Sequence, residues 1–124
     1  MDVTPLIPAD RQVIDSYGAG GFHVSGAAYQ GAILVFPDAT QPWPVAALAE
    51  VTTESLAPVI AHGNVQILLL GCGRRMQPVP LELRRALRHS GITVDAMDTG
   101  AACRTYNVLL AEDRRVAAAL LPAR

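Results

Sequence analysis

The residues most able to do chemistry in this chain lie in one stretch, residues 98–113. Its pattern predicts a helix that begins after Thr99, whose hydroxyl can accept a hydrogen bond from a free N–H of the first turn. A helix N-terminus carries partial positive charge and favours acidic residues. This sequence instead places Arg104 in the first turn and places Glu112 and Asp113 at the opposite end. Because one element breaks several local preferences, we expect a functional site or a partner element here.

Arg104 and Asn107 are three residues apart and share one face of the predicted helix. The five N–H donors of an arginine suit a carboxylate or a phosphate, and the positive end of a helix attracts the same groups. These residues therefore predict a site for a small anion. A second interpretation stays open, in which Arg104 pairs with an acid such as Asp95 or Asp98.

Two cysteines are the candidate nucleophiles. Cys103 falls in the first turn of the predicted helix, where the helix field lowers a thiol pKa. Cys72 follows a predicted neighbouring strand, so both thiols could face one crevice. Nucleophilic catalysis also needs a nearby base, and all three histidines lie outside these motifs. Buried spectator thiols are the simpler interpretation, and no Cys or His spacing resembles a metal-ligand set.

A second motif follows the apolar run 65–70 at the carboxyl end of a predicted strand. Open α/β sheets bind their ligands at such ends, and glycines let a backbone approach a ligand closely. The dinucleotide fingerprint fails because its third glycine would fall at Met76, and no Gly-Lys-Ser/Thr follows. A structural turn explains the motif as well. The ligand-binding candidates of the two motifs are Gly71, Cys72, Gly73, Arg74, Thr99, Cys103, Arg104 and Asn107.

Composition indicates one domain with a sizeable core, since the chain has 124 residues of which 51% are hydrophobic. We expect a flexible arm over residues 1–11, where Pro5 and Pro8 lie, and a single domain over residues 12–122. A net charge of −1 excludes a general attraction to nucleic acid or to acidic membranes. The longest apolar run is too short to span a bilayer. With no secretory start and no lysine, these features predict a soluble, cytoplasmic, bacterial protein with free thiols and no cofactor.

The order of predicted elements positions these motifs at one edge of a sheet. Strands over 22–24 and 31–36 read as a hairpin, and 41–44 as a rigid turn. Residues 45–51 are ambiguous between strand and loop, and a helix follows to His62 and ends at Gly63. A strand over 65–70, a helix over 81–90, a strand over 92–96, the helix after Thr99 and a strand over 115–121 complete the chain. This alternation predicts an α/β fold with a partly parallel sheet.

Five segments together resemble one known family, the Mth938-like domains. The resemblance runs from about residue 12 to residue 122, and the ordered string over 98–112, within the segment 97–112, is its most specific part. The other segments are 16–22, 31–37, Trp43 and Leu70-Gly-Cys-Gly73. The resemblance implies a three-layer fold around a mixed, mainly parallel five-stranded sheet with an additional antiparallel β element. Family members more usually carry Gly-Thr-Gly where this chain has Gly71-Cys72-Gly73, which argues against a catalytic Cys72.

The family includes a mitochondrial assembly factor for respiratory complex I, and the resemblance brings no established reaction with it. We therefore expect a non-enzymatic accessory or assembly module that acts through contact with a protein partner. The alternative is a protein or enzyme that binds a small anionic ligand in the crevice between residues 71–74 and 99–107. Neither hypothesis involves nucleic acid, a metal or direct insertion into a membrane.

Overall fold

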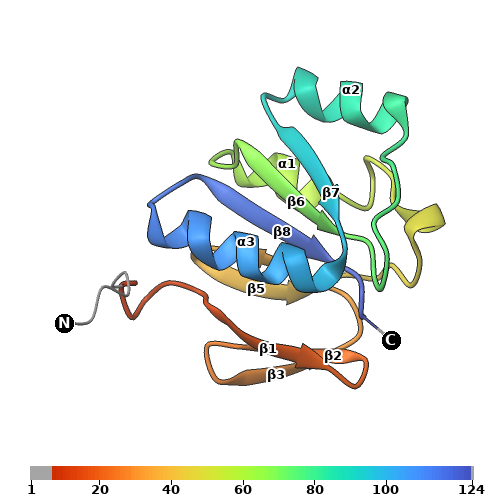
Figure 1. Cartoon of the computed structure of the whole chain (residues 1–124). Helices are drawn as coiled ribbons and strands as arrows, with labels where there is room; N and C mark the ends of the chain where they lie inside the picture. Colours follow the sequence, from red (N-terminus) through yellow and green to blue (C-terminus); the bar gives the residue numbers. More distant parts are fainter. Residues whose placement is uncertain (1–6, 124) are drawn as a thin grey trace.

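The computed structural model describes residues 7–123, and Figure 1 shows a central sheet with further elements packed on both of its faces. The predicted arm over residues 1–11 lies partly outside the described residues, and the domain boundaries remain a prediction. Within the described part of the chain, no helix is long and apolar enough to cross a membrane.

The central sheet has five strands in the order β5-β4-β8-β6-β7. Strand β6 pairs in parallel with both β7 and β8, whereas β4 is antiparallel to β8 and to β5. Four strands therefore run in one direction and only β4 opposes them, which confirms the expected mixed, mainly parallel sheet. The strands are β4 (Ile33–Phe36), β5 (Ala39–Pro42), β6 (Ile67–Gly71), β7 (Thr93–Met97) and β8 (Val116–Leu120).

One face of this sheet is covered by the short helix α1 (Ala57–His62) and by α2 (Leu81–His89). Gly63 ends α1 in the left-handed conformation, as its sequence predicts. Helix α2 carries its acid early and its basic residues late, in agreement with the helix dipole. Its Arg84 donates a hydrogen bond to the Val94 carbonyl of β7 over 3.1 Å, which fixes α2 against the sheet.

The opposite face carries α3 (Thr99–Ala111) and a separate antiparallel sheet of β1 (Ile14–Gly18), β2 (Gly21–Val24) and β3 (Ala27–Gln30). Alternate residues of β6 point to the two faces, so Leu68 packs with the α1–α2 core and Leu69 with the α3 core. This double burial explains the nearly continuous apolar run in the sequence. The three-layer arrangement and the additional β element are confirmed.

The predicted hairpin between residues 22–24 and 31–36 is wrong. Strand β2 turns back at Ser25 and Gly26, whose φ values of 46° and 85° suit a two-residue hairpin loop. Its partner is therefore β3, a strand that the sequence reading missed. The chain then leaves the small sheet at Gly31, and β4 pairs with β5 and β8 in the central sheet.

One local prediction around β5 also needs correction, and the structure decides in favour of a loop a second one that was left open. Residues 41–44 were expected to form only a turn, but Gln41 and Pro42 belong to the edge strand β5. The ambiguous segment 45–51 contains a single 3-10 turn, η1 (Leu48–Glu50). Strand β5 lies at the edge of the sheet and is at most half-buried. Edge strands often carry polar residues, so the sequence of β5 gave little strand signal.

Candidate functional site

Thr99 joins the ends of three sheet elements. Its hydroxyl donates a hydrogen bond to the Leu121 carbonyl over 2.6 Å and accepts one from the Gly73 N–H over 2.8 Å. The Thr99 backbone N–H donates in turn to the Gly73 carbonyl over 2.8 Å. Thr99 is completely buried, and it is the one buried polar residue of the described chain. It therefore ties the segments that follow β6 and β8 to the start of α3.

The predicted cap of α3 is displaced by one residue. Asp98 is the N-cap, and its carboxylate accepts a hydrogen bond from the Ala101 N–H over 2.9 Å. Thr99 could not cap the helix because the strand ends already use its hydroxyl. The helix thus has an acid at its positive end, and the expected charge inversion is wrong there. It persists at the other end, where Glu112 is the C-cap and Asp113 follows it.

Gly71 is required by the close approach of β6 to Thr99. A Cβ atom on Gly71 would lie 2.9 Å from Leu120 Cδ2 and 3.0 Å from the Thr99 hydroxyl oxygen. Gly73 has a φ of +93°, a backbone conformation that favours glycine. The two glycines thus serve the packing and the turn at the strand end, and a ligand role for them stays a prediction.

The two thiols do not share a crevice. Cys72 lies in the α1–α2 core and Cys103 in the α3 core, so the sheet separates them. Burial raises the pKa of the Cys103 thiol from 9.0 to about 12, against a smaller lowering by the nearby Arg104. The expected lowering of that pKa is therefore wrong. Cys103 is the fifth residue of α3 and faces the core, where loss of solvation outweighs the helix field.

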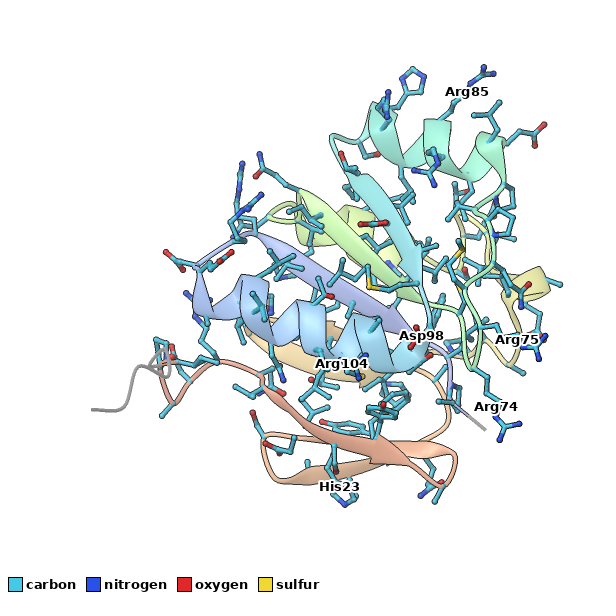
Figure 2. The ribbon with its side chains drawn as sticks, viewed as in Figure 1. His23, Arg74, Arg75, Arg85, Asp98 and Arg104 are labelled. Atoms are coloured by element: carbon cyan, nitrogen blue, oxygen red, sulfur yellow. The ribbon has the colours of Figure 1, made fainter. Side chains whose placement is uncertain are left out.

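Arg104 lies in the second turn of α3 and is exposed to solvent. Within residues 7–123 it forms no ion pair, so the expected pairing with Asp95 or Asp98 is not present. Figure 2 places it on the side of α3 that faces the small sheet. A Cβ atom on Gly100 would clash with the Tyr17 hydroxyl and would lie 3.3 Å from an Arg104 guanidinium nitrogen. Tyr17 of β1 and Arg104 thus both approach the first turn of α3.

Asn107 fastens the small sheet to α3. Its side-chain oxygen accepts a hydrogen bond from the Ile14 N–H over 3.0 Å, and its amide nitrogen donates to the Ile14 carbonyl over 2.8 Å. The adjacent Tyr106 hydroxyl donates to the Gln12 carbonyl over 3.0 Å. The Asn107 amide thus bonds both the N–H and the carbonyl of Ile14, as the backbone of a neighbouring strand would. These contacts give Asn107 a structural role whether or not it also contacts a ligand.

A hollow with a volume of about 940 Å³ lies elsewhere, beside β5. We call it the Trp43 cleft. Arg74 is the only predicted site residue among those that line it; Gly71, Cys72, Gly73, Thr99, Cys103, Arg104 and Asn107 do not. The structure therefore separates Arg74 from the rest of the predicted set. The lining residues are Gln30, Gly31, Ala32, Pro42, Trp43, Pro44, Val45, Ala46, Glu50, Arg74 and Pro122.

The Trp43 cleft was not predicted from the sequence. Its floor residue Trp43 is 3% exposed and donates its indole N–H to the Ser55 carbonyl over 2.8 Å, so it packs under loops as expected. The available signal was the segment Pro42-Trp43-Pro44, which places the chain's single tryptophan between two rigid residues. That signal names no neighbours, because the other walls come from distant segments.

Comparison with known proteins places this fold and these segments in a family. The family model described as "Protein of unknown function (DUF498/DUF598)" matches residues 14–121, which is most of the chain. The chain belongs to the DUF498/DUF598 family. An uncharacterized protein of Rhodobacter capsulatus is 40% identical to it over 88% of this chain and 83% of that relative.

Two further members show the range of this DUF498/DUF598 family. A Bordetella pertussis protein described as a Mth938-like domain is 32% identical, with a TM-score of 0.83 over 98% of this chain and 92% of that structure. The NADH dehydrogenase (ubiquinone) 1 alpha subcomplex assembly factor 3 of Danio rerio is 36% identical over 89% of this chain. The chain spans 64% of that assembly factor's length. The predicted resemblance to Mth938-like domains is confirmed.

Removing the Thr99 hydroxyl is expected to destabilise the fold. Thr99→Val keeps the side-chain volume but leaves the buried Leu121 carbonyl and Gly73 N–H without partners, at a cost of roughly 2–3 kcal/mol. Thr99→Ser keeps both hydrogen bonds and loses one buried methyl group, worth about 1 kcal/mol. Urea unfolding of the two variants measures the difference. A valine variant as stable as the serine variant would contradict the role given to the hydroxyl.

Cys103 is expected to resist alkylation in the folded protein. A pKa near 12 in place of 9.0 lowers the thiolate fraction at pH 8 by about a thousandfold. The measurement is the iodoacetamide reaction rate of a Cys72→Ala variant, in which Cys103 is the single thiol, with and without denaturant. Equal rates in the two conditions would show that the thiol is neither buried nor shifted.

Proposed function

We propose that this chain is a non-enzymatic accessory module of the cytoplasm, which acts through contact with a protein partner during assembly of a membrane complex. The supporting relative is named as an assembly factor of NADH dehydrogenase. The structural support is the use of the predicted crevice for internal bonding. Thr99 and Asn107 hold strand ends and the small sheet in place, so the crevice offers few polar groups to a reacting substrate.

The cytoplasmic location is supported by the two cysteines. Cys72 and Cys103 are both free and buried, and they lie on opposite faces of the sheet. Free thiols are the usual state of cysteine in a reducing compartment.

A small-anion site is the second candidate function, and Arg104 is the observation that favours it. Its guanidinium is exposed, has no ion pair within the described residues and lies close to the first turn of α3. Backbone N–H groups and an arginine together attract anions. The N-cap carboxylate of Asp98 already occupies this end of the helix and opposes a second negative charge. The protein-contact hypothesis therefore has the stronger support.

The proposed contact predicts a reproducible partner in native extract. The whole chain, tagged at one end and kept under reducing conditions, should retain the same protein in independent preparations. A urea-unfolded and immobilised sample of the chain is the matched control and should not retain it. Repeated failure to find such a protein, together with measurable turnover of a small molecule, would refute the proposal.

The anion hypothesis predicts thermal stabilisation that depends on one side chain. Phosphate, sulfate and a panel of carboxylates should raise the melting temperature of the wild-type chain but not that of Arg104→Gln. Arg85→Gln removes an exposed arginine from α2 and is the matched control, because it changes the net charge equally. If no anion stabilises the wild type more than it stabilises Arg104→Gln, the second candidate function is excluded.

A further inference from the structure

The Trp43 cleft is a preformed apolar surface. The Trp43 backbone N–H donates to the Ala32 carbonyl over 2.9 Å, and the Val45 backbone N–H donates to the Trp43 carbonyl over 2.8 Å. With the indole hydrogen bond to Ser55, these contacts fix the tryptophan at three points. Three of the lining residues are prolines, whose backbone is already restricted. Binding here costs little ordering of the protein, which favours affinity.

The cleft carries one unpaired positive charge. Arg74 is exposed and takes part in no ion pair within residues 7–123. Glu50 is the only acid in the lining, and its carboxylate accepts a hydrogen bond from the Ala46 N–H over 3.3 Å. Figure 2 shows the Arg74 side chain extending away from the loop after β6. Arg74 is thus the one basic side chain of the lining, and Glu50, which already accepts from the Ala46 N–H, is the one acidic side chain.

The position of Arg74 is set by the same contacts that hold the strand ends together. Gly73 immediately precedes it and is bound to Thr99 on both its N–H and its carbonyl. Pro122 lines the cleft directly after Leu121, whose carbonyl accepts from the same hydroxyl. Two walls of the cleft are thus anchored to one buried side chain. The arginine is presented from a fixed backbone.

We propose that the Trp43 cleft binds a short apolar segment of a partner protein, with a carboxylate of that segment held by Arg74. The inference rests on the proposed function, because it locates the contact with the partner. An arginine binds a carboxylate through two parallel N–H donors, and the exposed Pro42, Pro44 and Ala46, which lie beside the buried Trp43, receive the apolar side chains. A volume of about 940 Å³ is near the upper end for small-molecule sites, roughly 300–1,000 Å³.

The experiment places a photo-crosslinker in the cleft of the full chain. Ala46→p-benzoylphenylalanine probes the cleft, and Arg88→p-benzoylphenylalanine on the outer side of α2 is the control; both positions are exposed. After irradiation in cells, mass spectrometry identifies the attached peptides. We expect position 46 to capture one segment that has apolar residues next to an acidic side chain or a chain terminus. Position 88 should not capture that segment.

The captured segment is then made as a synthetic peptide and titrated against the purified chain. Arg74→Gln should weaken binding by about tenfold or more, whereas Arg85→Gln should change it by less than about twofold. A twin peptide whose carboxylate is replaced by an amide should lose about as much affinity as Arg74→Gln causes, with no further loss when the two changes are combined.

Each other outcome overturns the inference in a distinguishable way. Capture of a partner at position 88 alone leaves the proposed function standing and removes the cleft from it. Capture of a second copy of this chain at position 46 makes the cleft a self-association surface. Binding that is equal for wild type and Arg74→Gln removes the carboxylate. Absence of any captured protein at both positions, with no partner in native extract, defeats the inference and the proposed function together.

Discussion

The buried hydroxyl of Thr99 is the contact on which the architecture of this protein depends. It connects the turn after β6, the end of β8 and the first residue of α3 at the carboxyl edge of the sheet. In many open α/β proteins this edge is left free for a ligand. Here a side chain closes it, and Gly71 lets the strands come close enough for that closure.

The two faces of the sheet keep the two thiols apart, which is a second constraint on any reaction that would use both of them. Cys72 and Cys103 belong to different cores, so no arrangement of loops brings them together. Burial also keeps Cys103 protonated, because its thiolate would lose solvation that the nearby Arg104 does not replace. Both residues act as small apolar side chains in their cores.

The surface most suited to recognition lies beside the edge strand β5. Its walls come from the end of β3 and the link to β4, from the end of β5 and the segment after it, from the loop after β6 and from the residue after Leu121. These segments meet because the chain leaves the small sheet after β3 and enters the central sheet at β4, beside the ends of β6 and β8. A family whose relatives include an assembly factor is consistent with a rigid surface of this kind. The contact proposed there needs no reacting group.

The sequence by itself determined the α/β class, a central strand predicted over 65–70 and observed over 67–71, the helices α2 and α3, and the family. Those features depend on local periodicity and on an ordered string of residues, which survive without knowledge of the fold. Tertiary structure decided which strands pair, where Thr99 directs its hydroxyl, which face each cysteine occupies and what surrounds Trp43. Each of these depends on contacts between residues far apart in the chain, and the same local pattern is compatible with several of them. Only packing selects one.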